Sequence, residues 1–190
     1  MKKKILAGCL AVSCGLLSIH PVMSVPVLAA VVKQQEADPT RITALNEKNL
    51  ISLIVEAEKR YFYTDGGGKG ETKTFYIKKI QYRYLSVDIG TRKKLLEYLM
   101  MTFTKEASES YIRKRFIEYK GRMAQINADT GNSLEFKKTT AKLIKSSSTS
   151  KEYQLSVPYS DNQSKPERKI VKLKKVNGVW RIATPPEILF

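Results

Sequence analysis

IVKLKKVNGVWRI, residues 170–182, is the stretch of sequence that decides the fold class. Its centre is Asn177-Gly178, a dipeptide typical of two-residue β-hairpin turns because both residues readily adopt positive φ angles. The strands on the two sides of such a turn must run antiparallel to each other. The stretch therefore predicts an antiparallel sheet at the C-terminal end of the chain.

The segment before this hairpin predicts two further strands. Residues 140–145 and 153–157 are separated by a polar, serine-rich run at 146–150, which is typical of a turn. A longer connection, residues 158–166, leads into the C-terminal hairpin. Since each connection joins strands that follow one another in the chain, we expect an antiparallel meander.

Two more hairpins are predicted earlier in the chain. Apolar and polar residues alternate along residues 75–77 and 80–84, but the alternation shifts by one position across Lys78-Lys79. Such a shift would turn the apolar side chains to the other face of a strand, so a tight turn or bulge is expected there. Lys120-Gly121 marks the second hairpin turn.

Three helices are predicted from capping residues and apolar spacing. Asn46 is the expected N-cap of the first helix, which the glycines of residues 66–70 end. Thr91 and Thr104 are the expected N-caps of the other two, which form an α-hairpin over residues 92–116. Apolar residues at helical spacing predict the buried faces. They are Leu50, Leu53, Ile54, Ala57 and Tyr61, then Leu95, Leu96, Leu99 and Phe103, then Ala107, Tyr111 and Ile112.

These elements predict a single compact α+β domain of about three helices and an antiparallel meander of about eight short strands. We expect this domain to span residues 43–190, after a signal peptide at residues 1–29 and a flexible leader at residues 30–42. The chain without its signal segment has 161 of the 190 residues, which is enough for one domain with a sizeable core.

Residues 1–29 have the composition of a secretory signal peptide. Three lysines follow Met1, a mostly apolar stretch follows them, and Val27-Leu28-Ala29 offers small residues for cleavage after Ala29 or one residue later. Both cysteines, Cys9 and Cys14, and the single histidine, His20, would leave with this segment. We therefore expect a secreted protein without cofactor or metal site, and one that is not an enzyme of the Cys–His or Ser–His kind.

The chain is strongly basic. Its formal net charge is +16, and loss of the three lysines of the signal segment would leave +13. Outside the cell such a charge favours association with polyanions, which include nucleic acid, anionic lipid head groups and the phosphate-rich polymers of a Gram-positive wall. The anionic polymers of the wall are the expected partners. Because the protein is expected to be secreted, we do not expect a nucleic-acid partner.

One segment departs from this basic character. Residues 123–136, MAQINADTGNSLEF, form the longest run after the signal segment without Lys or Arg, and they include Asp129 and Glu135. Turn-forming residues fill its centre, so we expect an exposed acidic loop. The residues of this candidate site are Asn127, Ala128, Asp129, Thr130, Gly131, Asn132 and Ser133, and a secondary contact is expected at Asp65, Gly66 and Gly67.

Two other sets of residues were candidates for function. Glu118, Asp129 and Glu135 are close in sequence, and a pair of carboxylates could serve a glycosidase, but nothing in the sequence places two of them in an apolar cleft. The aromatic residues could form a binding platform, yet at strand and helix spacing we expect them in the core and its rim. They are Tyr76, Tyr82, Tyr84, Tyr111, Tyr119 and Trp180.

The middle third of the chain carries a series of short motifs shared with a known family. In order they are Tyr82-Arg83-Tyr84-Leu85, Ile89-Gly90-Thr91-Arg92-Lys93-Lys94-Leu95, Tyr98-Leu99, Phe103-Thr104, Ala107, Tyr111-Ile112, Gly121, Ala124-Gln125 and Ala128-Asp129. In order and spacing this series resembles the IseA family of secreted DL-endopeptidase inhibitors from Bacillus and its relatives. The similarity in element order extends over most of the chain after the signal segment.

The resemblance implies a single compact domain that is not an enzyme. We expect it to be a monomer, secreted or associated with the cell wall of a Gram-positive bacterium. Members of this family bind peptidoglycan hydrolases of the NlpC/P60 class and block their Cys–His cleft with a mobile acidic loop after the fourth strand. By position that loop is residues 127–133, and Asp129 is its acidic residue. The family's acid is closely flanked by glycine, whereas here Gly131 follows two residues later and Ala128 precedes Asp129.

Two other functions stay open from the sequence. Helices followed by an antiparallel sheet are also typical of cystatin-like or NTF2-like binding modules, which would need an apolar pocket beneath the sheet. A small carbohydrate hydrolase would need two carboxylates facing each other in a cleft.

Overall fold

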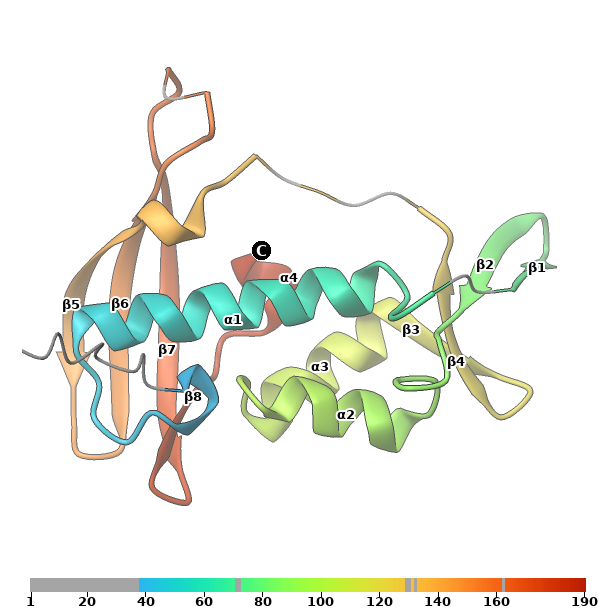
Figure 1. The fold of residues 1–190 in the computed structure, drawn as a ribbon, viewed down its shortest axis with the longest axis horizontal. Helices are drawn as coiled ribbons and strands as arrows, with labels where there is room; N and C mark the ends of the chain where they lie inside the picture. Colours follow the sequence, from blue (N-terminus) through green and yellow to red (C-terminus); the bar gives the residue numbers. More distant parts are fainter. Residues whose placement is uncertain (1–37, 71–72, 129–130, 132, 162) are drawn as a thin grey trace, which may run out of the picture. The chain divides into compact units, whose positions relative to one another are not determined.

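The structure is a computed structural model that describes residues 38–70, 73–128, 131, 133–161 and 163–190. The expected signal peptide and most of the expected leader lie outside these residues. The described residues belong to one compact unit, Glu36–Phe190. Over them the chain forms four α-helices, two short 3-10 helices and eight antiparallel strands in two sheets, which confirms the α+β class (Figure 1).

Helix α1, Glu47–Asp65, begins and ends as its sequence predicts. The side chain of Asn46 accepts a hydrogen bond from the backbone N–H of Asn49 at 2.8 Å, which satisfies one of the free donors of the first turn. At the other end, the N–H of Gly66 donates to the carbonyl of Phe62 at 2.7 Å. The predicted apolar face is buried, with no exposed surface on Leu50, Leu53, Ile54 and Ala57.

Helices α2, Arg92–Met100, and α3, Lys105–Arg115, form the predicted pair, and Thr91 and Thr104 are their N-caps. Helix α2 ends earlier than expected. The reason is a pairing with the last strand: the N–H of Thr104 donates to the carbonyl of Ile182, and the N–H of Ile182 donates to the carbonyl of Thr102, both at 2.8 Å. These bonds hold the chain in an extended conformation between the two helices.

The first sheet has the strand order β1-β2-β4-β3. Its two predicted hairpin turns are present, with positive φ at Lys78 and Lys79 in one and at Lys120 and Gly121 in the other. The sequence did not predict that β4 would pair with β2 and so lie between β2 and β3. The strands are β1 Thr74–Ile77, β2 Ile80–Tyr84, β3 Phe116–Tyr119 and β4 Arg122–Ile126.

The second sheet is the predicted meander, in the order β5-β6-β7-β8. The turn between its last two strands has φ of 49° at Asn177 and 81° at Gly178, the positive angles predicted from the Asn177-Gly178 sequence. The strands are β5 Thr140–Ser146, β6 Ser150–Val157, β7 Glu167–Val176 and β8 Val179–Ile182.

Both ends of the described chain differ from expectation. At the start, η1, Pro39–Arg41, is followed by Ile42, which is 4% exposed and accepts a hydrogen bond from the N–H of Trp180 at 2.8 Å. The last residues of the expected leader are therefore part of the domain. At the end, a helix that the sequence analysis did not predict, α4, Pro186–Leu189, follows Pro185 as its N-cap. Proline suits the first position of a helix because its φ is already helical and no N–H is needed there.

Helix α1 joins the two sheets, as Figure 1 shows. Near its start, a carboxylate oxygen of Glu47 accepts a hydrogen bond from the N–H of Ala141 on β5 at 3.3 Å. Near its end, the carbonyl of Asp65 accepts hydrogen bonds from Arg83 on β2 and Gln125 on β4. Among the described residues, no helix is long and apolar enough to span a lipid bilayer.

Candidate functional site: the connection between β4 and β5

The expected acidic loop lies in the connection from the first sheet to the second. This connection leaves β4 after Ile126, passes through η2, Phe136–Lys138, and enters β5 at Thr140 (Figure 1). Its described central residues, Asn127, Ala128, Gly131 and Ser133, are all exposed. Asp129, Thr130 and Asn132 lie outside the described residues, so the position of the acidic side chain stays a prediction.

The loop begins at a fixed point on the first sheet. The N–H of Asn127 donates to the carbonyl of Gln81 at 2.9 Å, which extends the pairing of β2 and β4 by one residue. The Asn127 side chain repeats this contact, since its Nδ2 donates to Oε1 of Gln81 at 2.9 Å. The N–H of Ala128 then bonds to the carbonyl of Ile126 at 3.0 Å, and the chain turns away from the sheet.

The loop ends at a second fixed point, on the connection between β6 and β7. The carbonyl of Ser133 accepts from the N–H of Ser160, and the N–H of Glu135 donates to the carbonyl of Pro158, both at 2.8 Å. Between them Leu134 forms an antiparallel bridge with Tyr159 and is 9% exposed. The exposed residues are therefore held at both ends, a geometry that limits the conformational entropy lost when such a loop binds.

The second acid of the base-free segment has a structural role. Glu135 is half-buried, and its carboxylate lies 2.5 Å from the ammonium nitrogen of Lys138 within η2. Next to it, Phe136 is 1% exposed and its ring packs edge-on against the ring of Phe190, with 4.9 Å between the centroids. Glu135 thus belongs to the anchor of the loop, and Asp129 is the remaining acid of the segment.

Asp65, where a secondary contact was expected, is buried in the structure. The Asp65 side chain has no exposed surface, and its Oδ1 accepts a hydrogen bond from Nε of Arg115 at 2.8 Å. This contact raises the pKa of Arg115. Gly67 is buried as well, whereas Gly66 is exposed. Asp65 therefore fastens α1 to α3 and the first sheet, and a contact with another molecule at Gly66 stays a prediction.

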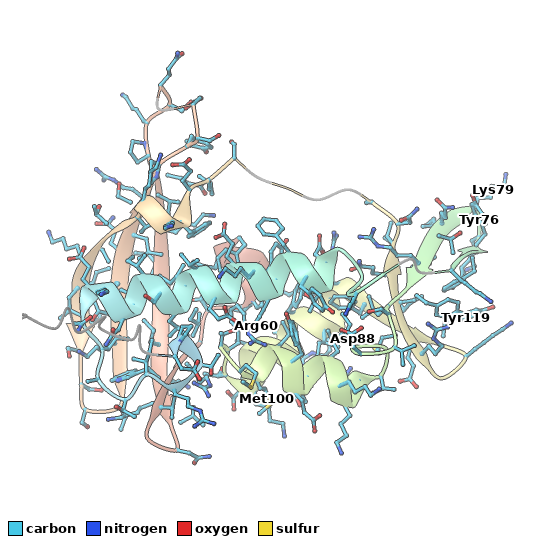
Figure 2. The ribbon with its side chains drawn as sticks, viewed as in Figure 1. Arg60, Tyr76, Lys79, Asp88, Met100 and Tyr119 are labelled. Atoms are coloured by element: carbon cyan, nitrogen blue, oxygen red, sulfur yellow. The ribbon has the colours of Figure 1, made fainter. Side chains whose placement is uncertain are left out.

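The aromatic residues divide between core and sheet surface. Tyr111 and Trp180 are buried, as expected for core residues. Tyr82, Tyr84 and Tyr119 are half-buried around Phe75 on one face of the first sheet. Figure 2 shows Tyr76 and Lys79 on the β1–β2 hairpin and Tyr119 on the β3–β4 hairpin, and Tyr76 is 66% exposed.

The described residues give little support to the other candidate sites. Glu118 is exposed on β3 and Glu135 is paired with Lys138, so these two acids do not face each other in an apolar cleft. Two surface hollows are lined mainly by charged and polar residues, one around Lys69, Asp88 and Arg122, the other along β5 and β6. Within the described ranges, no three His, Cys, Asp or Glu side chains are grouped so as to hold a metal ion.

Comparison with known proteins identifies the family. Residues 41–186 match the family described as IseA DL-endopeptidase inhibitor, and the chain belongs to this family. It is similar to a curated protein of Bacillus subtilis (strain 168), "Uncharacterized protein YoeB", with 32% identity over 146 residues that cover 73% of this chain and 80% of that protein. The match begins in η1 and ends at the start of α4, so it includes both sheets and both anchors of the loop. The resemblance found in the motifs is confirmed.

The residues that anchor the candidate loop are those that sequence reasoning missed. Gln81 is 46 residues from Asn127 in the chain, and Tyr159 and Ser160 belong to a different sheet connection. A glutamine within a strand and a Pro-Tyr-Ser sequence in a loop carry no local signal for such a role. Only the pairing of β2 with β4 brings Gln81 to the start of the loop.

Proposed function

We propose that the protein is a secreted inhibitor of NlpC/P60-type DL-endopeptidases, which it blocks by inserting the loop of residues 127–133 into the active-site cleft. In this way it restrains peptidoglycan hydrolysis and cell separation. The observation that carries the proposal is the combination of family membership with a base-free, exposed connection that is fixed to the fold at both ends.

The electrostatic argument concerns the contrast between the loop and the rest of the chain. In a protein of net charge +16, the Asp129 carboxylate in a loop without Lys or Arg is a local negative charge. A Cys–His cleft holds a cationic imidazolium when its thiolate is formed. An acidic loop in such a cleft gains a complementary charge where water is excluded, which favours specific binding and a slow dissociation rate. The protein then acts as a monomer by obstruction, without catalysis of its own.

The basic surface has a separate role in this proposal. After removal of residues 1–29 the chain keeps a net charge of +13, which favours retention by the anionic polymers of a Gram-positive wall. Retention there would keep the inhibitor at a high local concentration near its target.

The test is an assay of a purified NlpC/P60 DL-endopeptidase on peptidoglycan, with the mature protein and its Asp129→Lys variant. We expect Asp129→Lys to raise the inhibition constant at least about 30-fold, because loss of a desolvated charge pair costs about 2 kcal/mol or more. Glu97→Lys is the matched control, since it makes the same charge change at an exposed position of α2. Full inhibition by Asp129→Lys would contradict the loop mechanism, and absence of inhibition by the unchanged protein would contradict the target class.

A further inference from the structure

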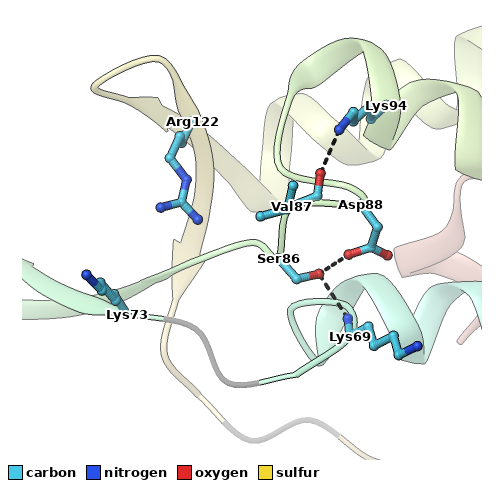
Figure 3. A pocket seen from close by; sticks show the side chains of 7 residues that line it. All are labelled: Lys69, Lys73, Ser86, Val87, Asp88, Lys94 and Arg122. Carbon is cyan, nitrogen blue, oxygen red and sulfur yellow. Dashed lines mark hydrogen bonds between the residues drawn. The ribbon is translucent and has the colours of Figure 1, made fainter.

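An open, positively charged hollow of about 530 Å³ lies beside the connection from β2 to α2. Figure 3 shows that its side chains come from separate parts of the fold: the glycine loop after α1, the start of β1, helix α2 and the start of β4. Among the described residues of the lining, four are cationic, Lys69, Lys73, Lys94 and Arg122, and Asp88 is the one carboxylate. The lining therefore carries a formal charge of +3.

The acids among the described residues do not form ion pairs with the cations of the hollow. Over the described part of the chain, no Asp or Glu oxygen forms an ion pair within 4.0 Å with any of the four cations. Lys94 instead donates to the backbone carbonyl of Val87 at 2.8 Å. Asp88 accepts from the hydroxyl groups of Ser86 and Tyr63 (Figure 3 shows the first of these bonds). Desolvation acts to raise the pKa of Asp88, but these two hydrogen bonds hold that pKa below its ordinary value.

Arg122 is held in a defined orientation. Its Nη2 donates to the carbonyl of Leu85 at 3.1 Å, and its guanidinium carbon lies 4.5 Å from the centroid of the Tyr84 ring. Stacking on the ring fixes the plane of the guanidinium and leaves the other N–H groups at its edge able to donate. This planar set of donors matches the oxygens of a phosphate group.

The backbone around the hollow is closely packed. The N–H of Lys69 donates to Oγ of Ser86 at 2.9 Å, and Ser86 is 6% exposed. A Cβ at Gly68 would lie 2.0 Å from that same Oγ, and one at Gly90 would lie 2.8 Å from the carbonyl oxygen of Ser86. Both positions therefore need glycine. The close packing keeps the connection from β2 to α2 in place between the surrounding cations.

We propose that this hollow binds phosphate groups of a phosphate-bearing polymer other than nucleic acid. The +3 charge of the described lining favours a ligand that carries several negative charges close together. The oriented Arg122 offers planar donors that can form two hydrogen bonds with phosphate oxygens. None of the described residues that line the hollow is aromatic, so the lining offers no ring on which a nucleobase could stack. This hollow would be the site at which the anionic wall polymers retain the protein, as suggested under the proposed function. The proposal does not depend on the inhibitory loop.

The test measures binding of linear polyphosphate and of poly(glycerol phosphate) by isothermal titration calorimetry at several salt concentrations. The first variant carries Lys69→Gln, Lys94→Gln and Arg122→Gln. The control variant removes the same charge from the second sheet, with Lys142→Gln, Lys172→Gln and Lys174→Gln, all at exposed positions. We expect the first variant to weaken binding at least about tenfold and the control to weaken it less than about threefold, because oriented charges act on a bound phosphate at short range.

Single substitutions keep the proposal testable if the triple variant folds poorly. Arg122→Lys keeps the charge and loses the planar donors, so we expect about a threefold loss. Lys94→Gln should weaken binding by a similar factor. Equal losses in the first and control variants would overturn the proposal in favour of a diffuse basic surface. Binding of poly-glutamate or single-stranded DNA as tight as that of polyphosphate would also overturn the proposal. So would a first variant that loses endopeptidase inhibition but binds the phosphate polymers as tightly as the unchanged protein.

Discussion

The ring of Phe75 on β1 stacks on the ring of Tyr119 on β3, with 4.5 Å between the centroids and 11° between the planes. These strands are the two edges of the first sheet, and a flat sheet would hold them about 14 Å apart. The sheet must therefore curl so that its edges approach each other. Phe75 also contacts Tyr82 and Tyr84, so the curled face encloses a small aromatic cluster separate from the main core.

The aromatic cluster should contribute measurably to stability. We expect Phe75→Ala and Tyr119→Ala each to lower the free energy of unfolding, with a coupling energy of about 1 kcal/mol between them in a double-mutant cycle. Urea denaturation of the two single variants and the double variant measures this coupling. Tyr76→Ala is the control, since Tyr76 is next to Phe75 on the opposite face and 66% exposed. We expect it to change stability by less than about 0.5 kcal/mol. Additive effects of the first two changes would contradict the stacking.

The buried Asp65 should be one of the most sensitive positions of the fold. Asp65→Ala removes the carboxylate that Arg115 contacts at 2.8 Å and leaves that guanidinium without its acid at a partly buried position. We expect a loss of about 3 kcal/mol in the free energy of unfolding. The double variant Asp65→Ala with Arg115→Met should lose less than the sum of the two single changes. Unchanged stability of Asp65→Ala in thermal and urea denaturation would show that α1 is held to the first sheet without this pair.

Two glycines with the same backbone angle give a matched test of packing. Gly68 and Gly70 both have φ of 89°. A Cβ at Gly68 would lie 2.0 Å from Ser86 and 2.9 Å from Ile89, whereas one at Gly70 would meet no atom of the described residues within 4 Å. We expect Gly70→Ala to cost about 1 kcal/mol from backbone strain alone, and Gly68→Ala to cost about 3 kcal/mol because a clash is added. Urea denaturation of both variants measures the difference, and equal losses would contradict the close packing at Ser86.

Glu58 should make stability depend on pH. Partial burial in α1 raises the pKa of its carboxyl from 4.5 to about 7. The folded protein therefore binds this proton more tightly than the unfolded chain does. The stabilising effect is fully present below pH 4.5 and is lost as the pH rises through about 7.

The test compares Glu58→Gln with the unchanged protein. We expect no difference in the free energy of unfolding at pH 4.5 and a gain of about 1 kcal/mol for Glu58→Gln at pH 8, a value reduced for the partial exposure of this side chain. Glu97→Gln on the exposed surface of α2 is the control and should not alter the pH dependence. A parallel pH profile for Glu58→Gln and the unchanged protein would contradict the raised pKa.

The local elements were largely predictable because their causes are local. Asn46, Thr91 and Thr104 cap the three long helices through hydrogen bonds to residues three positions later. The turns at Lys120-Gly121 and Asn177-Gly178 have the positive φ angles that their sequences favour. The shift in alternation across Lys78-Lys79 is also explained by a tight turn. Helix α4 was missed, although Pro186 at its first position was a usable signal.

The candidate site was predictable only in part. Its place in the chain and its exposed ends follow from the base-free segment and its turn-forming residues. The burial of Asp65 was not predictable, because an aspartate followed by glycines is typical of an exposed helix end. Its partner Arg115 is 50 residues away in the chain, and no local property of either residue indicates the contact.

By itself the sequence determined the three long helices, the hairpins, the antiparallel class and the family of this protein, since these depend on capping, turn geometry and motif order. Only the tertiary structure decided that β4 lies between β2 and β3, that Phe75 meets Tyr119, and that Lys69, Lys94 and Arg122 surround one hollow. The reason is that these contacts join residues far apart in the chain. No local sequence pattern specifies such contacts. They form because strand pairing and core packing together lower the free energy of the whole fold.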